Sequence, residues 1–378
     1  MNSRTENRIK IIFFDHAPFM GGAEIAILRH IRYLNKDKFE PYLISSKESI
    51  EFVKQATDLL GGNVKFISFK RLKPISFNSI LKFIQSVFES IRICLKIKPD
   101  YIVANVERAF YVSFITSVIM RVKLILFIRD FEFSHKLLKF TDWKVTKYLP
   151  VSNNIAEYYH LKNKTQIVYV GSDIRNKSNL INLNDIMEIK NRYKILGTDF
   201  VIGSTSRIYR EKGPFMLLEA FNQIIRSNPD LINNLKLIFV GEGPDLKELK
   251  DKISGYSLLT NVILAGFSTQ IHIWYKIFKV FVHASVYNEP FATTVIEAAL
   301  SKCPIVATDT GGTSEFIEDN QTGLLIKPNC SDITQALLTL YRDPKLANIL
   351  AENAYQKAIK FNTEEKITSE LEQIYLNC

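Results

Sequence analysis

Two glutamates in one short segment are the strongest sign of chemistry in this sequence. Glu289 and Glu297 stand in an E-x7-E spacing within NEPFATTVIEAAL at 288–300. The first follows an expected strand at 280–284, and the second lies near the start of the next helix. A carboxylate can accept both vicinal hydroxyls of a ribose, and a second one nearby can hold a hydroxyl of another sugar. Between them, the backbone N–H groups of 291–294 would form a helix N-terminus, which attracts an anion.

Two further segments could bind phosphate groups. GSTSRIYREKG at 203–213 places Arg207 and Lys212 between an expected strand and helix, at the edge where open α/β folds bind ligands. A guanidinium and an ammonium there suit a diphosphate, although a solvated charged loop is the alternative. Gly21 and Gly22 follow the first expected strand and open the first helix. Their backbone N–H groups could approach an anion, although they could equally form an ordinary turn.

These segments need a scaffold of alternating strands and helices, and the rest of the sequence supplies one. Short β-rich runs alternate with helical patterns, starting at Ile9–Phe14, and the alternation restarts at Phe200–Ser204 after the polar stretch 171–198. This pattern predicts βαβ units and an α/β fold with two Rossmann-like, doubly wound parallel-sheet domains in tandem. We expect an N-terminal domain at 1–175, a C-terminal domain at 176–360, and a C-terminal helix at 361–378 that packs back toward the N-terminal domain.

Composition excludes several other classes of protein. The chain has 378 residues, 47% of them hydrophobic and 23% charged, with only 15 Gly, 12 Pro and 4 Cys, which excludes disordered, collagen-like and disulfide-rich chains. The cysteines are too dispersed for a CxxC pair, so zinc and disulfides are not expected. We expect no secretion signal, and no apolar run reaches the ~20 residues of a spanning helix. The predicted location is therefore the cytoplasm.

The positive charge is concentrated in the first half of the chain. The net charge is +10, but residues 1–180 contribute +13 and residues 181–378 contribute −3. Such asymmetry indicates an anionic partner for one domain. In the stretch 68–101, apolar residues from Phe77 to Leu95 recur at helical spacing and are bordered by basic ones. The basic residues are Lys70, Arg71, Lys73, Lys82, Arg92, Lys96 and Lys98. Such a helix either packs on a sheet or rests on an anionic bilayer.

Taken together, the motifs resemble those of glycosyltransferase family 4, whose members are retaining nucleotide-sugar enzymes of the GT-B fold. The resemblance covers nearly the whole chain, from GGAE at 21–24 through SRIYREKG at 206–213 and VGEGP at 240–244. It continues through EPFATTVIEA at 289–298 to ALSKCPIVATDTGGTSE, which ends at Glu315. It implies two Rossmann-like domains facing a central cleft, with acceptor on the first and donor on the second.

The resemblance also implies roles for individual residues. Arg207 and Lys212 would neutralise the departing diphosphate, Glu297 would hold the ribose, and Glu289 would contact the transferred sugar. The other positions implied in donor binding are Gly21, Gly22, Glu242, Phe267, Phe291, Ala292, Thr293 and Thr294. Many members carry a histidine where this sequence has Arg129-Asp130, and Arg129 or Asp130 could orient the acceptor or donor there or form a structural salt bridge. His16, beside the Gly-Gly turn, could reach the same side, although a structural histidine is the alternative. The sequence contains no DxD motif, so we expect no required metal, and no cofactor is implied.

The resulting hypothesis is a retaining, metal-independent glycosyltransferase. It would move a sugar from a UDP- or GDP-sugar to a hydroxyl of a lipid-linked or cell-surface glycan of the capsule, O-antigen or exopolysaccharide type. The basic N-terminal domain could bring it to the inner face of an anionic membrane. One alternative is a GT-B phosphorylase or a sugar-nucleotide epimerase. Another is a basic nucleic-acid-binding protein, but no RGG, KH or RRM-like motif accompanies the charge, so nucleic acid is not expected as a partner.

Overall fold

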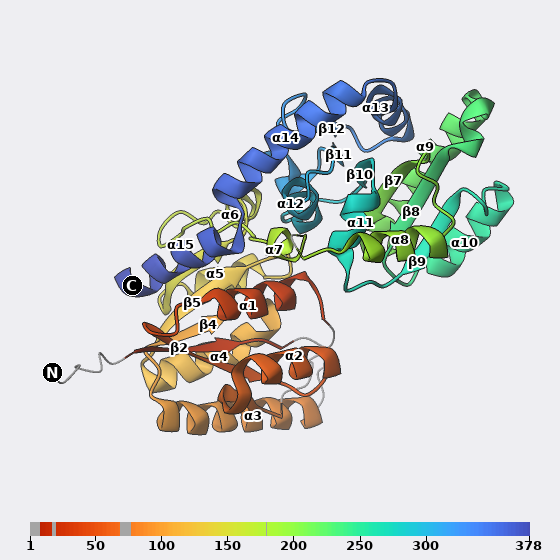
Figure 1. The fold of residues 1–378 in the computed structure, drawn as a ribbon. Coiled ribbons are helices and arrows are strands. Elements are labelled where there is room, and N and C mark those ends of the chain that lie inside the picture. The colour runs from red at the N-terminus through yellow and green to blue at the C-terminus, as the bar shows by residue number, and fades with distance from the viewer. Residues whose placement is uncertain (1–7, 17–19, 69–76, 179) are drawn as a thin grey trace. The chain divides into compact units, whose positions relative to one another are not determined.

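The computed structural model describes residues 8–16, 20–68, 77–178 and 180–378 (Figure 1). The chain divides into two compact units. Unit 1 comprises Met1–Gly171 and Glu364–Cys378, and unit 2 comprises Ser172–Thr363. The sequence-based boundaries were placed after residues 175 and 360. Each unit contains a six-stranded parallel sheet flanked by helices, so the predicted pair of Rossmann-like, doubly wound units is confirmed.

Unit 1 is built on a sheet with the strand order β3-β2-β1-β4-β5-β6. Its strands are β1 (Ile9–Phe14), β2 (Phe39–Ser45), β3 (Val64–Phe66), β4 (Tyr101–Ala104), β5 (Lys123–Ile128) and β6 (Val145–Pro150). Its helices are α1 (Gly22–Tyr33), α2 (Ile50–Leu60), η1 (Gly61–Asn63), α3 (Phe77–Ile97), α4 (Glu107–Met120), α5 (His135–Thr141), α6 (Asn153–Tyr158) and α15 (Glu364–Asn377). The central strands β1 and β4 are apolar apart from Lys10, as expected for a parallel sheet with helices on both faces.

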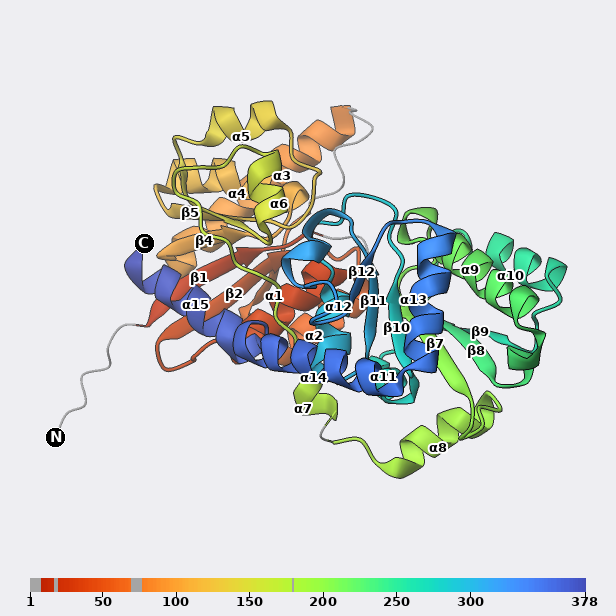
Figure 2. The same cartoon turned by 90° about the horizontal axis from the view of Figure 1, so that it is seen from above.

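The C-terminal helix α15 belongs to unit 1 although it is last in sequence. It packs against α1 (Figures 1 and 2). The buried His30 of α1 contacts the hydroxyl groups of Thr368, at 3.3 Å, and Tyr375, at 3.1 Å. Where the chain leaves the unit, the carbonyl of Gly171 accepts a hydrogen bond from Arg29 at 2.6 Å. A Cβ at Gly171 would lie only 3.0 Å from the Cα of Glu364, so α15 approaches the chain closely there.

Unit 2 repeats this architecture with the strand order β12-β11-β10-β7-β8-β9. Its strands are β7 (Phe200–Thr205), β8 (Leu235–Val240), β9 (Val262–Gly266), β10 (Val280–His283), β11 (Ile305–Thr308) and β12 (Leu324–Ile326). Its helices are α7 (Ile174–Ser178), α8 (Leu183–Arg192), η2 (Arg210–Lys212), α9 (Pro214–Ser227), η3 (Pro229–Asn233), α10 (Leu246–Gly255), α11 (Ile271–Ile277), α12 (Thr293–Leu300), η4 (Gly311–Glu315), α13 (Cys330–Arg342) and α14 (Pro344–Phe361).

The core of unit 2 joins the strands of the sheet to the helices that flank it. Buried residues of β7, β8 and β10 pack with the apolar faces of α9, α10 and α13 in one continuous cluster. The described residues of the polar stretch 171–198 form no strand, as expected, but they fold into α7 and α8, which pack against α11. Within the described part of the chain, no helix combines the length and the apolar character that crossing a membrane requires.

Candidate active site

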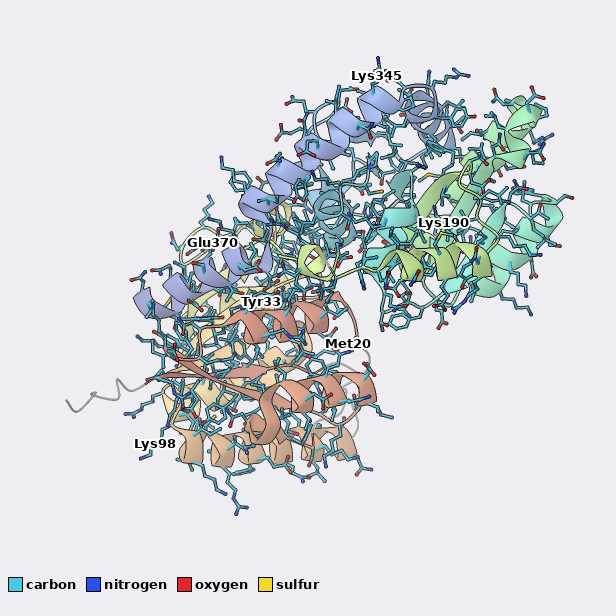
Figure 3. The ribbon with its side chains drawn as sticks, in the orientation of Figure 1. Met20, Tyr33, Lys98, Lys190, Lys345 and Glu370 are labelled. Atoms are coloured by element: carbon cyan, nitrogen blue, oxygen red, sulfur yellow. The ribbon has the colours of Figure 1, made fainter. Side chains whose placement is uncertain are left out.

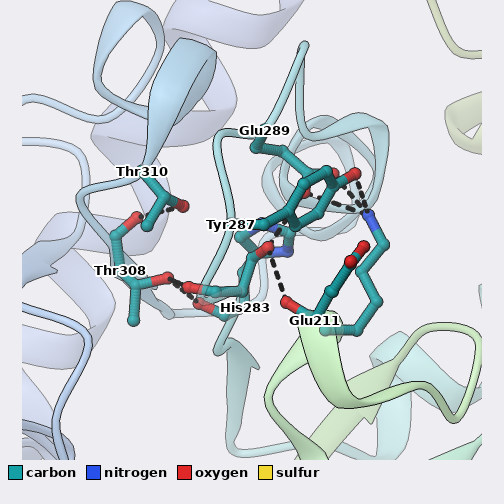
Figure 4. Close-up of polar contacts among 8 residues, drawn as sticks. Glu211, His283, Tyr287, Glu289, Thr308 and Thr310 are labelled. Carbon is teal, nitrogen blue, oxygen red and sulfur yellow. Dashed lines mark hydrogen bonds and ion pairs between the residues drawn. The ribbon is translucent and has the colours of Figure 1, made fainter. Parts of the chain in front are cut away.

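The loops that follow β7 and β10 meet at the carboxyl edge of the unit 2 sheet, because these strands are hydrogen-bonded neighbours. The backbone carbonyl of Glu211, in the loop after β7, accepts hydrogen bonds from Val286 N at 2.8 Å and Ser285 Oγ at 3.2 Å. The hydroxyl of Thr308, at the end of β11, donates to the carbonyl of Ser285 at 2.6 Å. The backbones of three loops are therefore fixed to one another, as Figure 4 shows.

Lys212 and Glu289 form an ion pair at this edge. Lys212 Nζ lies 2.6 Å from Glu289 Oε1 and 3.0 Å from Oε2, and it donates to the hydroxyl of Tyr287 at 3.0 Å. Ser285 Oγ donates to Glu289 Oε2 at 3.0 Å. Figure 4 shows Tyr287 and Glu289 converging on this position. Glu289 is 5% exposed, so the pair is shielded from water on the carboxylate side.

The protonation states of the pair follow from its surroundings. Burial alone would lower the pKa of Lys212, but Glu289 and Tyr287 outweigh it and raise that pKa. Burial alone would raise the pKa of Glu289, but His283, Lys212 and Ser285 outweigh it and lower that pKa. Burial lowers the pKa of His283 to about 4, so this imidazole is neutral near pH 7. The site therefore holds one ammonium and one carboxylate.

Counting donors shows how Lys212 could bind a further group. An ammonium has three N–H donors, and the Lys212 bonds to Glu289 and Tyr287 use three acceptor atoms. Lys212 must therefore exchange a partner before it can donate to a phosphate. Glu289 accepts hydrogen bonds from both Lys212 and Ser285, which fixes the orientation of its carboxylate.

Two glycines hold the pair in place, because no other residue fits where they stand. Gly213, next to Lys212, has φ +70°, and a Cβ there would lie 1.8 Å from the carbonyl oxygen of Ala284. Gly311 has φ +57°, and its Cβ would lie 2.2 Å from the carbonyl oxygen of Glu289. The next residue, Gly312, donates its N–H to that same carbonyl at 2.7 Å. The close approach explains why glycines follow β11.

Glu297 belongs to a second contact group on the same edge. The hydroxyl of the fully buried Tyr275 lies 2.7 Å from Thr205 Oγ1 and donates to the carbonyl of Thr294 at 3.1 Å. It is 3.5 Å from Glu297 Oε2. Tyr275 thereby ties the end of β7 to the first turn of α12, which sets the position of Glu297.

The remaining predicted residues of unit 2 lie along this edge. Arg207 is exposed in the loop after β7, and the N–H of its neighbour Ile208 donates to the carbonyl of Glu242 at 2.9 Å. Glu242 and Phe267 are exposed neighbours, with Phe267 N lying 3.5 Å from Glu242 Oε1. Phe291 and Ala292 are buried, and Thr293 and Thr294 begin α12. The N–H of Thr293 already donates to the carbonyl of Phe291 at 3.1 Å.

In unit 1, the predicted Gly-Gly turn is an N-terminal cap. Gly21 is the N-cap of α1, and its N–H donates to Glu24 Oε2 at 2.9 Å. Gly22 is exposed, and no atom among the described residues would lie within 4 Å of a Cβ placed there. The packing of unit 1 therefore does not itself require glycine at position 22.

A buried polar network lies at the carboxyl ends of β1, β4 and β5 in unit 1. Asn105 Nδ2 donates to Asp15 Oδ2 at 2.6 Å, and Arg129 Nε donates to Asn105 Oδ1 at 2.7 Å. Of the predicted residues, Arg129 thus has a structural role in this network. His16 is buried, and burial together with Arg108 lowers its pKa to about 3. Burial raises the pKa of Asp130 to about 6.

Replacing Asp15 with Asn should change how stability depends on pH. Burial, reinforced by Glu24, raises the pKa of Asp15 to about 7. The folded state therefore binds a proton that the unfolded state has released, and stability falls as the pH rises from about 4 to about 7. The amide cannot ionise, so the stability of D15N relative to wild type should increase over that range, by up to about 4 kcal/mol. Urea unfolding of both proteins across the range measures this, and a pH-independent difference would refute it.

Several residues of these sites were absent from the sequence-based predictions. Asp15, Asn105, His283 and Ser285 all stand directly after strands or within two residues of a strand end, which is the signal that could have revealed them. Tyr275 lies inside α11, and no sequence pattern marks it. Among the described residues, no cluster of three or more His, Cys, Asp or Glu side chains could hold a metal ion.

Comparison with known proteins agrees with this architecture. Residues 185–357, which lie within unit 2, match the family model described as glycosyl transferases group 1. The poly(ribitol-phosphate) alpha-N-acetylglucosaminyltransferase of Staphylococcus aureus is 31% identical over 189 residues, which are 49% of this chain and 37% of that protein. A Campylobacter jejuni alpha-N-acetylgalactosaminyltransferase that acts on a diphospho-undecaprenol-linked substrate is 30% identical over 43% of each chain. This chain thus spans less than half the length of both relatives.

A solved structure extends the likeness to both units. The Anabaena protein HepE, crystallised with UDP and glucose, superposes with a TM-score of 0.82 over 98% of this chain and 100% of its own, at 22% identity. At that identity the likeness shows the fold, and it confirms the predicted GT-B architecture. The narrower assignment to family 4 stays a prediction. Residues 185–357, which lie in unit 2, thus resemble the glycosyl transferases group 1 family.

Proposed function

We propose that this protein is a glycosyltransferase that moves a sugar from a nucleotide-sugar donor to an acceptor hydroxyl. The observation that carries the proposal is the ion pair of Lys212 and Glu289, with Ser285 and Tyr287, at the carboxyl edge of the unit 2 sheet. Ligands of open α/β sheets bind at this edge. The pair also lies inside the region that matches the glycosyl transferases group 1 family.

Arg207 and Lys212 are proposed to bind the diphosphate of the donor. The Lys212–Glu289 pair carries no net charge, so the exposed Arg207 supplies the net positive charge that attracts the donor. As the bond to the sugar breaks, negative charge grows on the diphosphate. Lys212 can then shift a hydrogen bond from Tyr287 or Glu289 to a phosphate oxygen. Such preplaced donors stabilise the transition state more than the ground state.

The two glutamates are proposed to bind the sugars of the donor. Glu289 would accept a hydroxyl of the transferred sugar, and Ser285 and Lys212 fix the orientation of its carboxylate. Glu297 would accept the hydroxyls of the ribose, in the position that Tyr275 determines. Glu242 and Phe267 would border the nucleotide base. We expect the reaction to retain the anomeric configuration and to need no cofactor.

The acceptor is proposed to be a lipid-linked or cell-surface glycan. The names of two relatives, which act on poly(ribitol-phosphate) and on a diphospho-undecaprenol-linked sugar, support this class. Unit 1 would hold the acceptor through His16 and Asp130. Arg129 would help to position this site indirectly, through its hydrogen bond to Asn105. No atom of another described segment would lie within 4 Å of a Cβ at Gly22, which would leave room for an acceptor group near the start of α1.

Thermal unfolding with a panel of nucleotides tests whether the proposed donor site exists and which nucleotide the donor carries. A ligand that binds only the folded state raises the thermal unfolding temperature. We expect UDP or GDP, and the matching nucleotide sugar, to raise it in a buffer that contains EDTA, because Arg207 and Lys212 rather than a metal neutralise the diphosphate. AMP and CMP serve as controls without the diphosphate. A shift that appears only with a divalent cation would refute metal independence, and no shift with any nucleotide diphosphate would refute the donor site.

A further inference from the structure

The helix α3 presents three distinct faces. Its buried residues are Ser86, Val87, Ser90, Cys94 and Ile97. At about 100° per residue, these lie within an arc of about 100°. They face α4, against which α3 packs, and Ser90 Oγ contacts Thr116 Oγ1 of that helix. The face of α3 that contacts the core is thus formed largely by small side chains.

The large apolar residues of α3 lie on a different face, which is exposed. They are Ile80 at 44%, Leu81 at 48%, Ile84 at 45%, Phe88 at 68% and Leu95 at 59% exposure. These five also fall within an arc of about 100°, and its centre is about 120° from that of the buried face. These five residues of the apolar series seen in the sequence therefore do not serve the core of unit 1, whereas Val87 of the same series is buried. An exposed apolar stripe of this size marks a surface that binds something.

The third face, next to the apolar stripe, is basic. Lys82, Arg92 and Lys96 are all exposed. Lys98, labelled in Figure 3, directly follows the helix. The one acidic residue of α3, Glu89, accepts hydrogen bonds from Ser68 and Gln85. Unit 1 as a whole carries 28 Lys and Arg against 19 Asp and Glu, or +9 of the total +10. Lys70, Arg71 and Lys73, which the sequence analysis included in this surface, lie outside the described residues.

We infer that α3 docks on an anionic lipid surface. Its apolar stripe, Ile80, Leu81, Ile84, Phe88 and Leu95, would enter the boundary between head groups and acyl chains. Its basic face would contact the anionic head groups beside it. An interfacial helix carries an apolar face and a basic face side by side. Each Lys or Arg near an anionic surface adds to the electrostatic attraction. A second copy of the chain is a poorer partner, because its own basic face would be repelled. The inference does not depend on the transferase activity.

Cosedimentation of the full chain with vesicles tests this inference without any donor. Wild type should bind vesicles that contain phosphatidylglycerol, bind phosphatidylcholine vesicles weakly, and bind less as salt increases. Phe88→Ser with Leu95→Ser should reduce binding at least about tenfold, and Lys82→Gln with Arg92→Gln and Lys96→Gln should do the same. The matched control is Leu259→Ser with Ile349→Ser, which removes two similarly exposed apolar residues from unit 2 and should leave binding unchanged.

Controls distinguish a loss of vesicle binding that the substitutions cause directly from a loss caused by misfolding or by self-association. All substituted residues are exposed, so circular dichroism and the unfolding temperature should match those of wild type. The basic-face variant keeps the test valid if the apolar variant misfolds. Absence of vesicle binding by wild type would overturn the inference, and so would equal binding by folded α3 variants. Sedimentation velocity that shows dimers in wild type and monomers in the apolar variant would also overturn it, in favour of a second copy as the partner.

Discussion

Lys212→Met should lower kcat/KM for the nucleotide-sugar donor by about 100-fold to 1000-fold, as loss of one preplaced donor to a developing anion does in other enzymes. The substitution removes the ammonium that we propose to contact the departing diphosphate. It also leaves the 5%-exposed carboxylate of Glu289 without its charged partner. Breaking such a pair costs about 3–5 kcal/mol of stability. Steady-state kinetics and urea unfolding measure the two effects separately.

A double variant separates catalysis from stability. In Lys212→Met with Glu289→Gln, no unpaired carboxylate is left, so much of the lost stability should return. Activity should not return, because the ammonium is still absent. Recovery of both stability and activity would contradict the proposal, since it would show that Lys212 serves only to neutralise Glu289. Lys212→Arg should keep the stability of the pair better than Lys212→Met does, because the charge is retained.

Glu297→Ala should raise the KM for the donor and strongly reduce turnover. A hydrogen bond to a charged group contributes about 1.5–3 kcal/mol, which corresponds to a loss of roughly 10-fold to 150-fold in kcat/KM. Tyr275 holds the backbone of α12 through the Thr294 carbonyl, so the helix should keep its place without the Glu297 side chain. Steady-state kinetics with varied donor concentration measures the change. The surface control is Glu352→Ala, which removes an exposed carboxylate paired with Lys302 and should leave the kinetics unchanged.

A modified donor tests whether Glu297 contacts the ribose itself. A donor with a 2′-deoxyribose should react poorly with wild type, because Glu297 loses one of its hydroxyl partners. The same donor should be no worse than the normal donor for Glu297→Ala. If the 2′-deoxy substitution costs both proteins equally, Glu297 does not bind the ribose, and the coupling between the two changes is zero.

The fold was predictable from the sequence because its signals are local. Apolar strands, helical periodicity and polar turns alternate along the chain, and each unit repeats them. The position of α15 could be anticipated only roughly, because the residues of α15 that contact His30 are more than 330 positions away from it in sequence. The outward direction of the α3 stripe could not be predicted. Periodicity shows that a helix has an apolar face, but the small residues that pack on α4 decide which face is buried.

The sequence predicted which segments form the candidate site, but it did not predict which side chains contact one another. The positions of the residues after expected strands predicted that Glu289, Glu297, Arg207 and Lys212 lie at one edge of the sheet. It did not show that Lys212 is paired with Glu289, because that contact depends on the Gly213 and Gly311 backbones. Tyr275 was not predicted because, in the sequence, a buried tyrosine in a helix cannot be told from any other aromatic residue of the core. For Arg129 the sequence left a ligand-binding role and a structural role open, and the bond to Asn105 shows that Arg129 belongs to the buried polar network of unit 1.

Equilibrium binding of UDP and GDP, measured by titration calorimetry, tests the central claim that the unit 2 sheet edge is the donor site. The comparison is between wild type and the double variant Lys212→Met with Glu289→Gln, which has the same net charge. We predict that one of the two nucleotides binds wild type and that the double variant binds it at least about tenfold more weakly, because a direct ammonium–phosphate contact is lost. Equal affinity for the two proteins, or no binding of either nucleotide to wild type, would contradict the claim.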